Sequence, residues 1–514
     1  MAKIQFKPYI SNETLLFPPN LGEIIPLDSP VRLISTIVDQ LDISEVIGSY
    51  CNVSDGPSAY HPRMLLKVVL YGYLNDIYST RHLEAAMKRD IHLIWLSSYQ
   101  FPDHTTINRF KARCKDSIKA IFASMVAILV EMGEVELSED HFIDGTTIRA
   151  RSSKTKIKWR KSAERYKAIS AENINKAVDA LLEEIGQSER EELTEEGHIT
   201  YTAEEARELA EKIEKRAQEK GLKVKGKVKA VIEACDSNRA HAQTIEKCNG
   251  RCGYAPSDPD CGIMHAKEDG YDGRPTPNYN VQIATQNQYV LNYDVYDQAN
   301  DKSIALDFVD TCIEENKVVP KSVTADSGYG SEENYVGLRE RSIEAIVKYP
   351  YYDAQTSRRP VKKGSYDNFG FKLSPDQTTL ICPAGHLMEV VAVTEEYSKR
   401  GFRSDSSTLR CSHCPTCPFR DRCCVPKNKN GTINRKLGNI REEEKAKAVL
   451  DRPENQVKLK RRSLEPEPVF AQLKYNHGYS RLRHFGRAKV RMDLGFVFMA
   501  LNILKLYKNT KKAV

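Results

Sequence analysis

The first 135 residues place apolar side chains three and four positions apart over several long segments. This spacing gathers apolar side chains on one face of a helix. Pro30 and Pro62 begin two of these segments, as expected because the first turn of a helix does not need the amide donor that proline lacks. The pattern predicts an all-α domain over residues 1–135, with helices at 30–47, 62–77, 79–97 and 101–135.

The last of these segments begins with polar residues that give way to basic ones. Asp103 or Thr105 is a candidate cap for its first turn. A small helix followed by a polar and then basic helix is typical of helix-turn-helix readers of DNA. An ordinary helical bundle with a basic, solvated face explains the same pattern. On the DNA-binding alternative, the candidate contacts are Thr105, Thr106, Asn108, Arg109, Lys111 and Arg113.

After residue 135 the pattern changes to short segments with the alternation of strands, separated by helical segments. Two of the strands are joined around Asn287 and Gln288, which indicates a hairpin. The order is strand, long insert, strand, strand, helix, strand, helix, strand, which predicts an α/β protein with a mixed sheet. The segments are 139–150, 279–286, 289–298, 302–316, 321–330, 331–342 and 344–350.

Two stretches interrupt this α/β pattern. Residues 151–229 are highly charged and poor in aromatic residues, which predicts a projecting helical hairpin followed by a lysine-rich loop at 220–230. Residues 351–450 are irregular and rich in cysteine, and two closing helices follow at 463–478 and 486–508. The predicted domains are 1–135, helical; 136–350, the first part of the core with a charged helical insertion at 151–255; 351–450, a cysteine-rich insertion; and 451–514, the end of the core.

Composition narrows the class of protein. The chain has 514 residues, of which 40% are hydrophobic and 29% charged, so a wholly disordered or fibrous chain is not expected. No stretch approaches the about 18 apolar residues that a membrane span needs, and the N-terminus lacks the apolar run of a secretory signal. The net charge of +7 permits a nucleic-acid partner without establishing one. The 13 cysteines are an odd number, which favours cytoplasmic thiols over a disulfide framework.

Three acidic residues stand at suggestive places: Asp144 lies on a predicted strand, Asp326 lies at the end of another, and Glu467 lies at the start of a helix. Carboxylates at the ends of strands converge at one edge of an α/β sheet. Because like charges raise one another's pKa, three carboxylates in a small space need a cation. Oxygen ligands favour Mg²⁺ or Mn²⁺, and two such ions support phosphoryl transfer. Each acidic residue alone is equally consistent with a surface position or a helix cap.

Two basic residues flank the glutamate. Lys474 follows Glu467 by seven residues, close to two helical turns, so both are expected on one helix face. Arg462 precedes Glu467 by five residues and is a second candidate for holding a phosphate.

Four motifs around these residues, FIDGTTIRA, YNVQIATQ, TADSGYGSEENY and RRSLEPEPVFAQLKYNHG, together with residues 60–113, resemble the DDE transposases of bacterial insertion sequences. The resemblance extends from about Phe6 to Lys508. It implies a ribonuclease-H-like core in which Asp144, Asp326 and Glu467 are the catalytic, metal-binding acids.

The family often has a tyrosine, an arginine and a lysine around the glutamate. Lys474 matches the lysine and Arg462 the arginine, whereas Leu459 and Lys460 occupy the region of the expected tyrosine. Glu465 competes with Glu467 for the acidic position, and we prefer Glu467 because Lys474 and the following Pro-Val-Phe fit it.

The resemblance implies an enzyme that binds the terminal inverted repeats of an insertion sequence and carries out Mg²⁺-dependent cleavage and strand transfer on double-stranded DNA. It also implies a homodimer, since an element has two ends, and a cytoplasmic bacterial protein that reaches the nucleoid through DNA. Two alternatives remain: a catalytically silent DNA-binding protein derived from a transposase, and a metal-dependent nuclease without strand transfer.

Six cysteines gather in the cysteine-rich insertion, with a C-x2-C-x2-C-x5-C spacing that is typical of zinc sites. The preferred ligands of a structural Zn²⁺ are Cys382, Cys414, Cys417 and Cys423. Cys411, Cys424, His386 and His413 are possible substitutes, and a cluster of reduced thiols is the alternative. A looser group, interpreted as incidental, contains Cys235, Cys248, Cys252 and Cys261.

Overall fold

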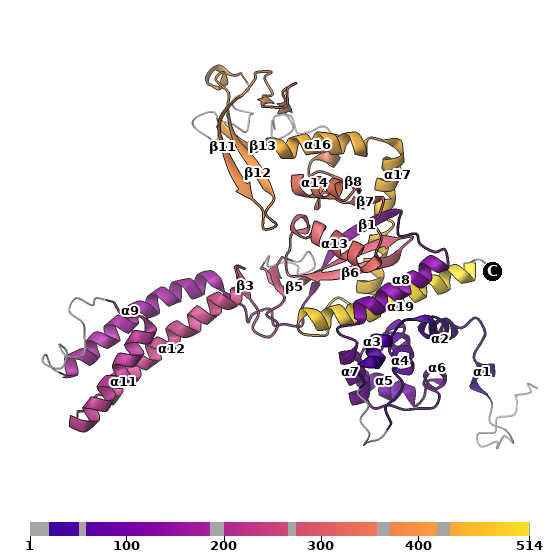
Figure 1. Ribbon diagram of the computed structural model, residues 1–514, viewed down its shortest axis with the longest axis horizontal. Coiled ribbons are helices and arrows are strands. Elements are labelled where there is room, and N and C mark those ends of the chain that lie inside the picture. The colour runs from indigo at the N-terminus through magenta and orange to yellow at the C-terminus, as the bar shows by residue number, and fades with distance from the viewer. Residues whose placement is uncertain are drawn as a thin grey trace, which may run out of the picture.

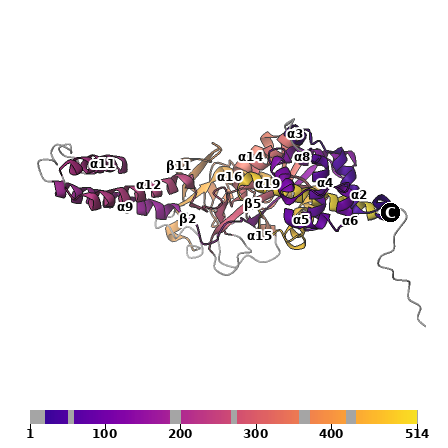
Figure 2. The same ribbon diagram turned by 90° about the horizontal axis from the view of Figure 1, so that it is seen from below.

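A computed structural model describes residues 20–50, 58–185, 200–220, 222–265, 274–356, 371–418 and 432–512. Figure 1 shows a helical domain at one end of the long axis, a helical arm at the other, and a mixed sheet between them. A small β module lies above the sheet in the same view. Seen from below, in Figure 2, the arm and the helical domain again lie on opposite sides of the sheet. The chain is therefore a mixed α/β protein with a helical N-terminal part.

The N-terminal part is helical, as its apolar spacing predicts, but its helices are shorter than predicted, and the segments 30–47 and 79–97 each form two helices. Pro30 and Pro62 are the first residues of two of them, which confirms their predicted role. The single helix predicted over 101–135 is instead two helices, separated at Cys114–Ser117. The helices are α1 (Leu21–Ile24), α2 (Pro30–Gln40), α3 (Ser44–Gly48), α4 (Pro62–Leu74), α5 (Thr80–Met87), α6 (Ile91–Leu96), α7 (His104–Arg113) and α8 (Ile118–Glu131).

The helical domain packs against the last helix of the chain, α19 (Arg487–Lys512), through a buried polar cluster. Lys111 of α7 is 4% exposed and its ammonium lies 3.2 Å from a carboxylate oxygen of Asp493, which is 1% exposed. The hydroxyls of Tyr73 and Tyr479 also donate to Asp493. Burial opposes the charge on Asp493, but Lys111 and the neighbouring donors hold its pKa well below its usual range. This ion pair joins the helical domain to the last helix of the chain.

The central sheet has the order β4-β5-β1-β7-β8. β6 also pairs with β5, as the second strand of a hairpin. β5 runs antiparallel to β1, β4 and β6, whereas β7 is parallel to both β1 and β8. The mixed sheet predicted from the sequence is therefore present. Its strands are β1 (Asp140–Arg149), β4 (Gly262–Met264), β5 (Thr276–Gln286), β6 (Tyr289–Tyr296), β7 (Ser322–Ala325) and β8 (Glu344–Val347).

The β5–β6 hairpin turns where the sequence predicts it. Asn287 and Gln288 have φ of 53° and 64°, the positive values that a two-residue hairpin turn requires. Helices then cover the sheet, and the closing helix predicted at 463–478 is an α-helix that continues as a π-helical turn. These elements are α13 (Ala305–Asn316), α14 (Glu332–Glu340), α15 (Tyr352–Thr356), α16 (Leu437–Leu450), α17 (Pro453–Arg462), α18 (Pro466–Ala471) and the π turn Gln472–Asn476.

The charged insertion forms the arm and differs from the predicted hairpin. Its described residues form three helices, α9 (Arg160–Ile185), α11 (Ala203–Lys220) and α12 (Lys225–Cys248), and a short β2–β3 pair at its base (Lys158–Trp159 and Gly253–Tyr254). The loop predicted at 220–230 is wrong from Lys225 onward, where α12 begins. Val224, Val228 and Val231 lie at helical spacing among the lysines and are buried in the arm's own apolar cluster, which stabilises the third helix.

The cysteine-rich insertion is more regular than its sequence indicates. A three-stranded antiparallel sheet forms from β11 (Glu389–Tyr397), β12 (Arg403–Arg410) and β13 (Thr432–Lys436). A two-stranded pair, β9 (Lys372–Leu373) and β10 (Leu380–Ile381), precedes this sheet in the chain. Polar residues occupy most positions of β12, so strict alternation is absent. The prediction of an irregular module was therefore wrong for these strands.

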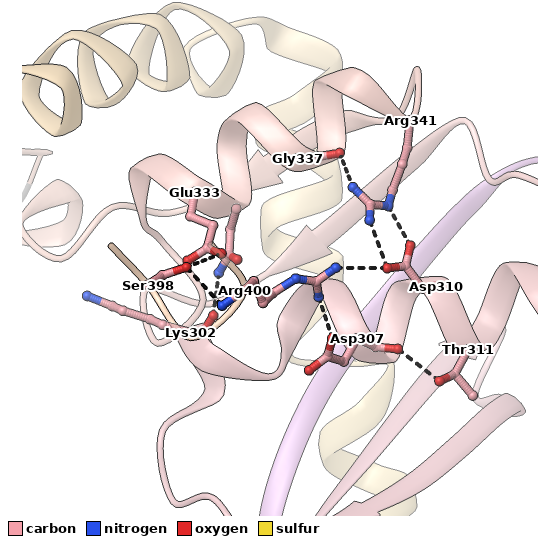
Figure 3. A network of polar contacts seen from close by, with 10 residues as sticks. Lys302, Asp307, Asp310, Thr311, Glu333, Gly337, Arg341, Ser398 and Arg400 are labelled. Atoms are coloured by element: carbon pink, nitrogen blue, oxygen red, sulfur yellow. Dashed lines mark hydrogen bonds and ion pairs between the residues drawn. The ribbon is translucent and has the colours of Figure 1, made fainter. Parts of the chain in front are cut away.

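The tip of the β11–β12 hairpin docks on α13 of the core. Figure 3 shows the Arg400 guanidinium contacting Asp307 and Asp310, with one nitrogen 3.1 Å from Asp310. Arg341 approaches Asp310 from α14, and Ser398 donates to a carboxylate oxygen of Glu333 at 2.9 Å. These contacts hold the β module against the helices that cover the sheet.

In the part of the chain that the structure describes, no helix combines the length and the apolar character needed to cross a bilayer.

Candidate functional site

Asp144 and Asp326 lie side by side on neighbouring parallel strands. Phe142 of β1 is in register with Thr324 of β7. Asp144 follows Phe142 by two residues, and Asp326 follows Thr324 by two residues. Asp144 is mid-strand, and Asp326 comes directly after the last residue of β7. Because β1 continues beyond the end of β7, the structure brings Asp144 beside the C-terminal end of β7, where Asp326 lies.

Glu467 reaches the same place from the C-terminal helices. It is in the first turn of α18, and Arg462 ends α17 just before it. The Arg462 guanidinium lies 3.2 Å from Asp144, 3.6 Å from Asp326 and 3.4 Å from Glu467. Three carboxylates from segments far apart in the chain thus converge on one cation.

Glycines make room for this cluster. A Cβ atom at Gly145 would lie 2.0 Å from the amide nitrogen of Gln282 and 2.9 Å from a carboxylate oxygen of Asp301. A Cβ at Gly328 would lie 2.8 Å from a carboxylate oxygen of Asp326. The glycines in FIDGTT and ADSGYG are therefore required by close approach rather than by unusual φ angles.

Asp301 is a fourth carboxylate that the sequence did not indicate. It lies in a short 3₁₀ turn, Asp301–Ser303, and accepts hydrogen bonds of 2.8 Å from the side-chain amides of Asn280 and Gln282. A signal was available: β6 is antiparallel to β5, which is antiparallel to β1, so β6 ends at the same sheet edge as β1. Asp301 follows β6 by five residues.

The electrostatics of the site disfavour charge on Asp144. Burial raises the pKa of Asp144 to about 6, and the nearby carboxylates of Asp326 and Asp301 add to the increase. The Arg462 guanidinium and the amide of Gly145 work in the opposite direction without cancelling the rise. A further cation at this edge would relieve the repulsion.

Glu465, the competing glutamate, is held by contacts with Arg461 and Gln288. It is buried, lies 2.7 Å from the guanidinium of Arg461, and accepts a hydrogen bond from the backbone amide of Gln288 at 2.8 Å. Glu467, in contrast, is in the carboxylate cluster. The geometry therefore favours Glu467 as the acidic residue of this site.

Lys474 is in the π turn that follows α18. The expectation that Glu467 and Lys474 share a face assumed a continuous α-helix of about 3.6 residues per turn. A π turn has more residues per turn and changes this phase. The structure places Arg462 against the three carboxylates.

The candidate DNA-reading helix is α7. Asp103 caps it by accepting a hydrogen bond of 2.7 Å from the amide of Thr106, so the aspartate rather than Thr105 is the cap. The exposed positions are Thr105, Asn108, Arg109 and Arg113, and Thr106 is half-buried. The prediction that Lys111 faces DNA was wrong, because this lysine is buried against Asp493. The guanidinium of Arg113 stacks on Tyr50, 4.0 Å from the ring centre.

The cysteines of the β module are only partly placed. Cys411, which was outside the preferred zinc set, lies beside Cys382 and Cys414, and burial raises the pKa of its thiol. The rings of His386 and His413 stack with centroids 4.1 Å apart. Cys423, the fourth member of the predicted set, and Cys424 lie outside the described residues.

Within the described ranges, no three His, Cys, Asp or Glu side chains are arranged to hold one metal ion. The donor chemistry of the Asp144 cluster nevertheless fits a hard divalent cation, because its ligand atoms are carboxylate oxygens. Arg462 shows that the cluster accommodates a positive charge, and it sets the present spacing of the three acids.

Comparison with protein families gives two matches. A model described as a transposase domain matches residues 19–113, and a model described as a transposase DDE domain matches residues 381–507. The chain is a DDE transposase of an insertion sequence.

The second match covers Glu467 and Arg462 of the transposase, and neither match extends over Asp144 or Asp326. The first match covers α7 and most of the helical domain. Neither a curated protein nor a solved structure matches the transposase.

Proposed function

We propose that Asp144, Asp326 and Glu467 form the site at which this transposase cleaves DNA at the ends of its element and joins them to a target. The observation that carries the proposal is the convergence of these three carboxylates on Arg462 from β1, β7 and α18. Surface acids from segments this distant have no reason to share one cation.

The sheet supports a ribonuclease-H-like core. With β1, β5, β6, β7 and β8 numbered 1 to 5, the spatial order is 3-2-1-4-5, in which strands 1 to 3 are antiparallel neighbours and strands 4 and 5 are parallel to strand 1. In this arrangement the first and fourth strands are neighbours. Their two aspartates are therefore adjacent, and the glutamate is supplied by a later helix.

The residues that would hold Mg²⁺ or Mn²⁺ are Asp144 and Asp326, with Glu467 facing them. Asp301, fixed by Asn280 and Gln282, lies beside Gly145 and Gly328 and would be a further candidate ligand. A bound divalent ion would make the attacking oxygen more nucleophilic and stabilise the leaving oxygen. The chain's own contribution is to hold the carboxylates in place before substrate arrives.

The proposed chemistry has two balanced steps. In the first, a water oxygen bonds to the scissile phosphorus while the bond from phosphorus to the 3′ oxygen breaks. The cut strand is then divided into a fragment that ends in a 3′-hydroxyl and a fragment that begins with a 5′-phosphate, and the proton lost by the water is balanced, through solvent, by the proton gained by the 3′ oxygen. In the second, the 3′ oxygen bonds to a phosphorus of target DNA, and a target 3′-hydroxyl leaves. Arg462, at the centre of the cluster, is placed to contact the phosphate in both steps.

End recognition is assigned to α7. Thr105, Asn108 and Arg109 are exposed on its first two turns, the part of a recognition helix that usually contacts base edges. Arg109→Ala should weaken binding to the terminal inverted repeat. An equal loss on all sequences would instead assign this residue to phosphate contact. Because an element has two ends, two copies of the transposase are expected on the assembled DNA.

The experiment is cleavage of a labelled element end by purified protein with Mg²⁺, followed by a strand-transfer assay with the pre-cleaved end. Asp326→Asn should abolish both reactions and leave end binding largely intact. Asp353→Asn is the matched control, because Asp353 is an exposed aspartate paired with Lys348 outside the site. Normal cleavage by Asp326→Asn would overturn the assignment. Cleavage without joining would identify a nuclease.

A further inference from the structure

The base of the arm carries an unusual concentration of positive charge. Residues 151–167 contain eight lysines or arginines and one glutamate, so this short segment alone is as positive as the whole chain, whose net charge is +7. A second segment, 477–489, contains four arginines or lysines and no acidic residue. We refer to residues 151–167 and 481–489 together as the collar.

The charge changes sign along a single helix. The first eight residues of α9, 160–167, have four basic residues and one acidic residue, whereas the remaining residues, 168–185, have one basic residue and four acidic ones. A helix that needed only to stay soluble would not require this separation. The basic end lies where the arm joins the core (Figure 1), next to β2 and β3.

The backbone of the collar is held in place by contacts between its two segments. The Arg481 guanidinium donates to the backbone carbonyls of Ala150, Arg151 and Ser152 at 3.2 to 3.4 Å. In return, the Arg151 guanidinium donates to the carbonyl of Arg483 at 2.8 Å. The two segments are therefore one preformed surface, in which some arginines fix the backbone and the lysines remain at the surface.

Three of the collar's lysines form no ion pair with another described residue. Lys156, Lys158 and Lys161 are exposed, and no carboxylate of the described residues lies within 4.0 Å of their ammonium groups. Glu164, the nearby acidic residue, pairs with Arg160 at 2.7 Å. Two aromatic rings are exposed among them, Trp159 at 37% and Phe485 at 41%. A preformed surface of unpaired lysines suits a polyanion better than a folded partner.

The collar also follows the catalytic site closely along the chain. The part of β1 that follows Asp144 ends at Arg149, and residue 151 comes two residues later. At about 3.3 Å per residue, the strand from Asp144 to Arg149 covers about 16 Å. On its other side the collar touches the helical domain, where the Arg483 guanidinium lies 4.2 Å from the ring centre of Tyr78. α7 is on the side of this domain that faces the arm (Figure 1).

We infer that the collar binds the sugar-phosphate backbone of duplex DNA on its way between the reading helix α7 and the catalytic carboxylates. The inference rests on the proposed function in one respect, that duplex DNA is the substrate. It assigns a second DNA contact to two segments: residues 151–167 lie outside both family matches, whereas 481–489 lie within the second match.

The test compares two doubly substituted full-length proteins, Lys156→Glu/Lys158→Glu in the collar and Lys225→Glu/Lys227→Glu at the start of α12. Both remove two exposed lysines from the same arm. The control pair is 21 or more residues from the base end of its helix, about 30 Å along the axis. Binding to a fluorescein-labelled duplex of mixed sequence, several helical turns long, is measured by anisotropy over a series of salt concentrations.

Each phosphate contact contributes about 0.9 to the slope of log K against log salt. The collar variant should therefore lose about two units of slope and bind much more weakly at low salt, whereas the α12 variant should keep the slope of the unaltered protein. Equal slopes for all three proteins, with intact thermal melting, would overturn the inference. So would equal losses in the two variants, because general charge repulsion explains that result.

A second measurement does not depend on removing charge. The chain has two tryptophans, and Trp95→Phe leaves Trp159 in the collar as the sole indole. Titration with the duplex should change the Trp159 emission and protect it from iodide quenching, whereas a short single strand should do so less at equal phosphate concentration. An unchanged emission at saturating duplex would contradict the inference. A stronger response to the single strand would overturn the assignment to duplex.

These outcomes are separable from failure of the proposed function. Asp326→Asn should bind the duplex with an unaltered slope. If it also cleaves normally, the catalytic assignment fails and the collar stands. If the collar variant binds and cleaves like the unaltered protein while Asp326→Asn is inactive, the collar fails and the catalytic assignment stands.

Discussion

Replacing Asp144 by asparagine should stabilise the transposase at neutral pH while abolishing its chemistry. Asp144 is buried beside two other carboxylates, and its pKa is raised from 3.8 to about 6. Between these two pH values the folded protein keeps a proton that the unfolded chain has lost, so the free energy of unfolding falls as pH rises through this window. Above pH 6 the full cost of the charge remains.

The size of the effect follows from the shift. About two pKa units at about 1.4 kcal/mol each correspond to about 3 kcal/mol at pH 7. Asparagine keeps the shape of the side chain and cannot ionise, so Asp144→Asn should recover up to this amount and raise the melting temperature by several degrees. Below pH 4 the two proteins should melt together, because both side chains are then neutral.

The assay is thermal melting followed by circular dichroism at pH 7.5 and pH 4. A chelator is present so that no metal ion binds the unaltered protein at Asp144 and not the variant. Asp353→Asn, which removes an exposed carboxylate, should not change with pH in this way. The reasoning is refuted if Asp144→Asn destabilises the protein at pH 7.5, or if its gain persists at pH 4. In the unaltered protein, cleavage should correspondingly increase as pH rises through about 6.

Three further outcomes are expected. Lys111→Ala should lower the free energy of unfolding by about 3 to 5 kcal/mol, because it leaves Asp493 buried without its partner. Arg109→Ala, in contrast, should leave the melting temperature almost unchanged and should affect DNA binding. Arg400→Ala should increase hydrogen exchange in β11 and β12, with no change in α19, because it removes the ion pairs that dock the hairpin on α13. Metal analysis should find about one zinc per chain; a metal-free protein that folds normally with a chelator would contradict the zinc prediction.

The local part of the site was accessible from the sequence. Asp144 and Asp326 could be paired because each lies in or directly after a short β-rich segment, and carboxylates at the ends of strands converge at one sheet edge. Asp301 was not identified because its place depends on the direction of β6, which only the hairpin register fixes. Arg462 was named as a phosphate contact, but its position against all three acids depends on how α17 packs on the sheet.

Long-range packing explains the other differences. Lys111 looks like its exposed basic neighbours on α7, and nothing within that segment reveals Asp493, which lies 382 residues later. The start of α12 was hidden by lysines that surround three buried valines. In the β module, the strands are held by backbone pairing among mostly polar side chains, so periodicity carries little signal.

The Lys111–Asp493 pair has a consequence for how the protein is made. A ribosome releases the helical domain long before it reaches residue 493, so Lys111 and the Tyr73 hydroxyl must wait for their partner during synthesis. The helical domain therefore reaches its final packing only when the last helix has emerged. A product that stops short of α19 would retain α7 in sequence but not its supported position, so the DNA recognition that we propose for α7 would depend on completion of the chain.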